Sequence, residues 1–307
     1  MSANNPDRPL TDAPDNRTAV TDVDEARILF LCHGDHPDRV VDLAADLARD
    51  EVANLYLLLA VSAPEQTPLE LVEPPCDARR DLAQYELKIK TESADSIGVH
   101  SLIRYGRKHD NIVQSVLDND EINTLVTEDV DDSSLLDVFR SVNPDERYVP
   151  ADSDIVIASH VEYLNAINSI LVPIAGEPHS GMAIEVAHAL ASQNNAWIEL
   201  FHVIDHDASD HQREQAEKYI SAGLDRVEEF DDTDTWLLED DDVADAIIEQ
   251  SQYYDLTVLG APQKGRLRRF AFGSTTSAVQ EDARSVVITV RRNTDESWLG
   301  RWVGRGT

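Results

Sequence analysis

A glycine-punctuated segment near the C-terminal end has the residue types best suited to binding an anion. It follows an apolar run at 256–259 and contains, in order, Gly260, Gly265, Gly273, Ser274 and Thr275. Glycine lets a ligand approach the main chain, and a helix N-terminus offers N–H groups and partial positive charge. The pattern predicts a phosphate site, with Ser274 and Thr275 offering hydroxyls or capping a helix from about 276 to 284. A strand-turn-helix connection without a ligand is the alternative.

Basic residues are interleaved in the same segment, between Lys264 and Arg269. They could contact phosphate oxygens, dock on an acidic partner, or balance the acidic surface of the protein itself. The segment is not a Walker loop, because no Gly-Lys-Ser/Thr triplet follows four variable residues.

The remaining polar groups form no recognisable catalytic set. The histidine pairs 33/36 and 202/206 have a spacing suited to two metal ligands, but neither has a third. The acidic run Glu239–Asp242 lacks the spacing of a calcium loop and is interpreted as a helix start. We therefore expect a binding protein and not an enzyme, with slow hydrolysis of a bound nucleotide left open.

Composition limits the class of protein. The 307 residues include 59 Asp and Glu against 26 Lys and Arg, a net charge of −33, yet 42% are hydrophobic. Apolar segments with regular periodicity exclude a disordered acidic chain. A surface adapted to concentrated salt is the preferred explanation, and a mesophilic protein with a cationic partner is the alternative. Residues 260–307 carry nine bases and four acids, so 1–259 carry −38, which argues against binding nucleic acid.

The cysteines and the N-terminus point to a cytoplasmic protein. Cys32 lies in an apolar run and is expected in the core, and Cys76 has no metal or redox spacing to it. The polar N-terminal residues lack a signal-peptide core, and no apolar stretch of 18 residues occurs.

Two successive series of apolar segments must position the glycine segment. The first predicts strands at 27–32, 55–61, 100–105, 122–127 and 154–158, and the second at 169–174, 197–204, 235–238, 256–259 and 285–290. Helical periodicity lies between them, and the turn at Gly176 repeats the turn at Gly34. Strands that are apolar on both faces favour parallel pairing. We predict an α/β fold with two doubly wound five-stranded parallel-sheet domains.

The predicted organisation has four parts. Residues 1–24 are a disordered tail, 25–166 and 167–293 are the two domains, and 294–307 are a basic tail with Trp298 and Trp302. This tail could lie on an anionic membrane, in the groove of a partner, or against its own domain.

The segment at 260–275 resembles the nucleotide loop of the universal stress protein family, written Gly-x2-Gly-x9-Gly-Ser/Thr. Gly260 and Gly273 have the family spacing and Ser274 follows, but Gln263 stands at the middle glycine position. The order of strands and helices is also similar to that of tandem universal stress proteins of the UspA-like, haloarchaeal type. The resemblance covers about residues 27–292.

This resemblance implies an architecture and a ligand. The fifth strands, at 154–158 and 285–290, would pair antiparallel and form a pseudo-dimer within the chain. The second domain would bind ATP or a related adenine nucleotide, with Mg²⁺ as a possible counter-ion. Its crevice would be bounded by Ala175, Gly176, Val203, Leu259, Gly260, Gly265, Gly273, Ser274 and Thr275. The backbone at Val203 would meet the adenine, whereas relatives that bind ATP carry Asp in place of Ala175.

The first domain is expected not to hold phosphates, because the carboxylates within Thr127–Ser134 would repel them. The sequence thus favours a regulator or sensor with a nucleotide in its second domain. The alternative is an interaction protein without nucleotide, because 175–179 and 260–265 are similar to variants in domains attached to amino-acid and cation transporters. Such a protein could dock on a membrane transporter or another protein through 264–269 and the tryptophan tail. Homodimerisation is left open.

Overall fold

The computed structural model describes residues 26–93, 96–129, 153–175, 178–227, 230–261 and 272–292. The first domain contains β1 (Arg27–Leu31), α1 (Pro37–Glu51), β2 (Asn54–Ser62), η1 (Leu69–Leu71), α2 (Cys76–Glu92), β3 (Val99–Gly106), α3 (His109–Asn119), β4 (Thr124–Glu128) and β5 (Asp154–Ser159). The connection to the second domain contains the short 3₁₀ helix η2 (Val161–Tyr163).

The second domain repeats this order. It contains β6 (Ser169–Pro173), α5 (Pro178–Asn194), β7 (Trp197–Ile204), α6 (Asp210–Leu224), η3 (Asp225–Val227), β8 (Thr233–Glu239), α7 (Val243–Ser251), β9 (Leu256–Gly260), α8 (Phe272–Asp282) and β10 (Val286–Arg291). Each half of the described chain is therefore a strand-helix alternation, as the apolar periodicity predicts.

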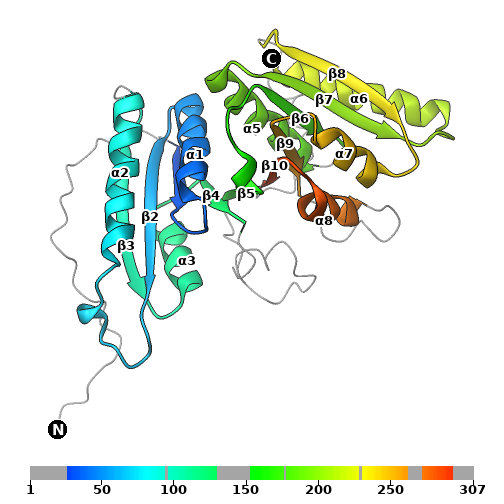
Figure 1. Ribbon diagram of the computed structural model, residues 1–307. Coiled ribbons are helices and arrows are strands. Elements are labelled where there is room, and N and C mark those ends of the chain that lie inside the picture. The colour runs from blue at the N-terminus through cyan, green and yellow to red at the C-terminus, as the bar shows by residue number, and fades with distance from the viewer. Residues whose placement is uncertain are drawn as a thin grey trace.

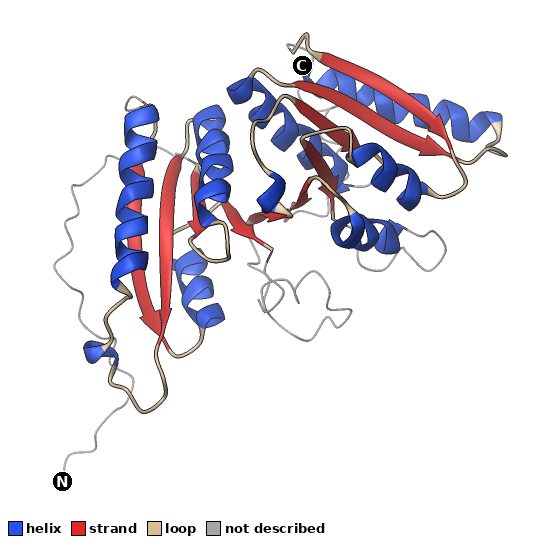
Figure 2. Ribbon diagram, viewed as in Figure 1, coloured by secondary structure: helices blue, strands red, loops and turns tan. Residues whose placement is uncertain are grey.

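The described strands form one continuous sheet in the order β3-β2-β1-β4-β5-β10-β9-β6-β7-β8 (Figures 1 and 2). Pairing is parallel within each half, and β5 pairs antiparallel with β10 at the seam. There Arg291 lies opposite Ile155 and Val287 lies opposite Ser159. The predicted α/β class and the antiparallel pairing of the fifth strands are confirmed.

Local sequence explains where the helices begin. Pro37 opens α1, with Asp38 in its first turn, and the predicted apolar stripe of α1 is buried. Ser209 caps α6 in a capping box with Gln212. Asp242 caps α7 by accepting hydrogen bonds from N–H groups of the first turn, as expected for an acidic helix start.

Helices cover both faces of the sheet. On one face, α1 and α5 pack against each other and against the central strands, and α2 joins the same core. On the other face, α3 covers the first domain, and α7 and α8 cover the second. One core therefore runs across both domains through α1 and α5, which makes the seam part of the folded interior.

Several sequence-based boundaries need correction. Helix α8 begins at Phe272, four residues before the predicted start, so Ser274 and Thr275 lie in its first turn and do not precede it. Strand β1 ends at Leu31, one residue short of Cys32. The two predicted tails and the basic residues 264–269 lie outside the described residues. In the part of the chain that is described, no helix has the length and apolarity needed to cross a membrane.

Candidate functional site

The candidate site of the second domain lies where β6, β7 and β9 end and where α5 and α8 begin. In an open parallel sheet, ligands bind in the crevice beyond the carboxyl ends of the strands. The structure describes seven of the nine predicted residues at least in their backbone, and Gly176 and Gly265 lie outside the described residues.

Gly260 ends β9 in direct contact with the first turn of α5. A Cβ atom placed on Gly260 would lie 2.8 Å from the carbonyl carbon of His179 and 3.0 Å from the amide nitrogen of Ser180. Such distances are too short for any side chain, so only glycine allows this approach of strand and helix. The structure thus gives Gly260 a packing role between β9 and α5, and its contact with a ligand stays a prediction.

Ala175 and the residue before it are held by hydrogen bonds from α5 and β7. The Ala175 N–H donates to Ser180 Oγ at 3.1 Å. His202 Nδ1 donates to the carbonyl oxygen of Ile174 at 2.6 Å, and its ring lies edge-on to Tyr219. Burial lowers the pKa of His202, although this hydrogen bond acts in the opposite direction. His202 therefore orders the end of β6 as a neutral imidazole.

Val203 and Leu259 contribute to the crevice only through their backbone. Both side chains are buried in the core between the sheet and the helices α7 and α8. A ligand beyond the strand ends could contact their main-chain N–H and C=O groups, and specificity at these positions would not depend on side-chain chemistry.

The first turn of α8 contains three of the residues that the sequence predicts to bind an anion. Gly273 and Ser274 are in this turn, where helical N–H groups lack intrahelical acceptors, and Thr275 is buried beside Thr276. A helix N-terminus with a glycine in its first turn is suited to a phosphate. The corrected start of α8 moves the N–H groups of Gly273 and Ser274 from the preceding loop into the helix itself.

In the first domain, the strand end that corresponds to Gly260 carries a carboxylate. Strand β4 ends at Glu128 as β9 ends at Gly260, and both strands have five residues. The Glu128 carboxylate accepts hydrogen bonds from the His36 N–H, at 2.9 and 3.2 Å, just before α1. Its side chain packs on Gly34, whose φ of 104° suits glycine.

Burial raises the pKa of Glu128, and hydrogen bonds from the backbone of His36 and Asp35 act in the opposite direction. The sequence predicted only that acids near here would repel phosphate. The structure places one of them in the position at the start of α1 that an anionic ligand would otherwise face. The duplication of the sequence could have revealed this difference between the domains, because Glu128 stands in the first repeat where Gly260 stands in the second.

The cysteine and histidine side chains singled out in the sequence contact only nearby residues. Cys32 is partly buried against the core, and burial raises the pKa of its thiol to about 12. The rings of His33 and His109 lie 4.9 Å apart, and His206 pairs with Asp241. In the described ranges, no group of three His, Cys, Asp or Glu residues is arranged to hold a metal ion.

Comparisons with known proteins agree with this architecture. Residues 166–291 match the model of the universal stress protein family. A search of curated proteins found no match.

Solved structures share the fold at low sequence identity. A universal stress protein from Archaeoglobus fulgidus DSM 4304 is 15% identical, with 88% of this chain and 97% of that chain covered and a TM-score of 0.52. A Pseudomonas aeruginosa UCBPP-PA14 protein assigned to the same family is 14% identical, with 88% and 94% covered and a TM-score of 0.56. The cytoplasmic domain of a prokaryotic cation chloride cotransporter is 14% identical, with 90% and 99% covered and a TM-score of 0.58.

The match at residues 166–291 and the repeated topology lead to one assignment. Residues 166–291 are similar to the universal stress protein family, and the whole chain has the two-domain fold of the solved structures of that family.

Proposed function

We propose that this protein is a regulatory protein that binds ATP or a related adenine nucleotide in its second domain and does not bind one in its first. The phosphates contact the N–H groups at the start of α8, and the nucleoside lies along the ends of β6, β7 and β9. The protein acts by binding and not by catalysis. Mg²⁺ accompanies the phosphates as a counter-ion.

The observation that supports this asymmetry is the pair Glu128 and Gly260. In the first domain a buried carboxylate already accepts hydrogen bonds at the start of α1, so a phosphate there would meet like charge. In the second domain, the same strand position has no side chain, and the following helix begins with Gly273 and Ser274 in its first turn. An anion is therefore more favourable in the second domain.

Mass spectrometry of ligand released from gently purified protein, kept in molar salt, tests the proposal. We expect an adenine nucleotide in the wild type. Gly273→Val should lower the affinity about tenfold or more, because a branched side chain would crowd the phosphate position. Ala78→Val introduces the same side chain in the first turn of α2, in the other domain, and should leave binding unchanged. Equal nucleotide binding by both variants would refute the site.

A second candidate function follows from the likeness to the cytoplasmic domain of a cation chloride cotransporter. In this alternative the tandem domains dock on a membrane transporter and hold no nucleotide. Purified protein free of nucleotide, with no binding of added ATP, would favour the alternative. Copurification with a membrane transporter from its native host would then be the positive result.

A further inference from the structure

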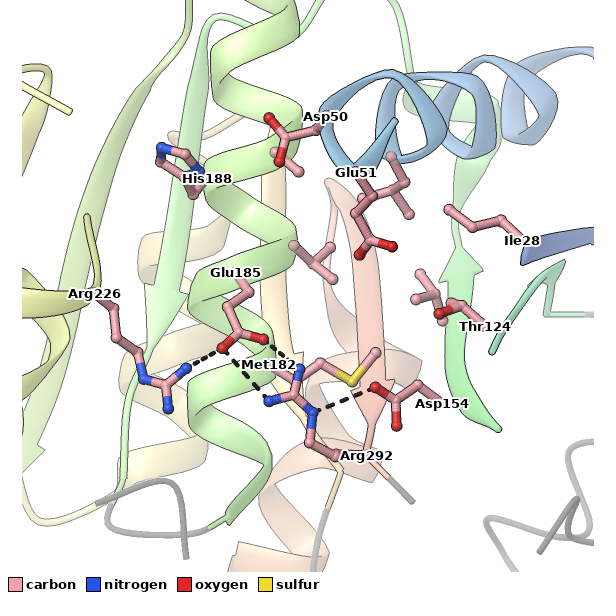
Figure 3. A pocket seen from close by; sticks show the side chains of 14 residues that line it. Ile28, Asp50, Glu51, Thr124, Asp154, Met182, Glu185, His188, Arg226 and Arg292 are labelled. Carbon is pink, nitrogen blue, oxygen red and sulfur yellow. Dashed lines mark hydrogen bonds and ion pairs between the residues drawn. The ribbon is translucent and has the colours of Figure 1, made fainter. Parts of the chain in front are cut away.

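A cavity of about 260 Å³ lies between the two domains, away from the nucleotide crevice (Figure 3). It is bounded by the C-terminal end of α1, the middle of α5, the starts of β4 and β5, and the residue after β10. Its volume is near the lower limit of small-molecule sites, which commonly lie at domain interfaces. It could therefore hold a small ligand.

The cavity combines apolar walls with an excess of negative charge. Ile28, Leu47, Val156 and Met182 supply apolar surface from four different elements. Four carboxylates and two arginines also line it. The formal charge of this set is therefore −2 when the histidine at position 188 is neutral.

The positive charges of the cavity are already engaged. Arg292 pairs with Glu185 and with Asp154, its Nε lying 3.3 Å from the Asp154 carboxylate, and Arg226 also pairs with Glu185 (Figure 3). These contacts neutralise the carboxylates from α5 and β5 but leave those at the end of α1.

The remaining two carboxylates, Asp50 and Glu51, come from the last turn of α1. Neither forms an ion pair with any other residue that the structure describes. Figure 3 shows the Glu51 carboxylate directed from α1 toward the side of the cavity that contains Asp154 and Arg292. Burial raises the pKa of Glu51, and the nearby carboxylates raise it further, with Arg292 acting in the opposite direction. The negative charge of Glu51 is therefore only partly balanced by nearby positive charge.

We propose that this cavity binds a small organic cation of the alkylammonium type. The charged nitrogen contacts the carboxylate of Glu51, and the short carbon chain packs on Leu47, which is four residues earlier on the same face of α1, and on Met182. A bare metal ion fits less well, because the described residues include no three-ligand cluster. The ligand would bridge α1 and α5 and so bind both domains at once.

Saturation-transfer NMR on the full chain tests this proposal with n-butylammonium chloride as the probe and 1-butanol as a neutral analogue of the same length. We expect saturable binding of the cation and about tenfold weaker binding of the alcohol, which cannot form a charge-assisted contact. Glu51→Gln should weaken binding of the cation by about tenfold or more, as for loss of a charge-assisted hydrogen bond.

Glu249→Gln is the matched control, because it removes one exposed carboxylate from α7, on the opposite face of the sheet. Both substitutions keep the size and shape of the side chain, so both variants should fold. Equal affinity of the two variants for the cation would indicate nonspecific attraction by an acidic protein. Equal binding of the alcohol would show that the cavity does not recognise the positive charge. Either result would overturn the proposal. Neither result depends on whether the second domain binds a nucleotide, so this test is independent of the proposed function.

Discussion

At the scale of single residues, Glu128 explains why two domains of one fold differ in their crevices. A glutamate side chain is long enough to reach from the end of β4 to the N–H of His36, and no ligand needs to supply the negative charge there. Gly260, at the same strand position, has no side chain and instead allows a close contact with the first turn of α5. One substitution in a repeated framework therefore determines whether the strand end carries a carboxylate that contacts the start of the first helix of its domain.

The pKa of Glu128 leads to a prediction about pH. Because burial raises its pKa in the folded state, its favourable contribution is complete below the unfolded value and is lost as pH rises through the folded value. Glu128→Gln should remove this loss. The midpoint of thermal unfolding of the variant should therefore rise relative to that of the wild type as pH increases from the ordinary pKa of 4.5 toward neutrality. The same comparison with Glu249→Gln should show no such change. A constant difference between wild type and Glu128→Gln would contradict the assignment.

At the scale of elements, the contact between β9 and the first turn of α5 determines the shape of the candidate crevice. His179 lies between this contact and the seam, because its Nδ1 accepts a hydrogen bond from the Arg292 N–H at 3.1 Å. The end of β10, the start of α5 and the end of β9 thus form one connected unit beneath the crevice.

Gly260→Ala should destabilise this unit by about 1–3 kcal/mol, because backbone atoms of His179 would have to move. Chemical denaturation measures the change in free energy of unfolding. Gly98→Ala is the control just before β3, where the added methyl would meet the flexible end of Asn54. We expect a clearly smaller effect there. If both variants lost the same stability, backbone crowding at Gly260 would not be the cause.

At the scale of the whole molecule, the two domains are joined both within the sheet and between the helices that cover it. The antiparallel β5–β10 pair continues the sheet, and Asn194 of α5 donates to Asp46 of α1 at 2.8 Å. Arg39 of α1 donates to three carbonyl oxygens in and after η2, at 2.7 to 2.9 Å. The connection between domains is therefore packed into the interface, and the two domains should unfold together.

The net charge of −33 leads to a prediction for the whole chain. Self-repulsion among carboxylates destabilises a compact state, and salt screens it, since the Debye length falls from about 10 Å at 0.1 M to about 3 Å at 1 M. Between 0.1 and 2 M KCl, the midpoint of thermal unfolding should rise by more than about 4 °C, or roughly 1–2 kcal/mol. Near pH 4.4, the isoelectric point, the rise should be much smaller. A salt response independent of pH would refute charge repulsion as its origin.

The sequence by itself determined the strand-helix alternation and the duplication. These follow from local periodicity and glycine spacing, which a chain carries residue by residue: β7, for example, has the predicted bounds Trp197–Ile204. Only the tertiary structure decided how Glu128 is used, how closely Gly260 approaches His179, and that α1 and α5 enclose a cavity. Each of these contacts joins residues far apart in the chain, such as Glu128 and His36, which are 92 positions apart. Their geometry depends on how packed helices and strands meet, which no local pattern encodes.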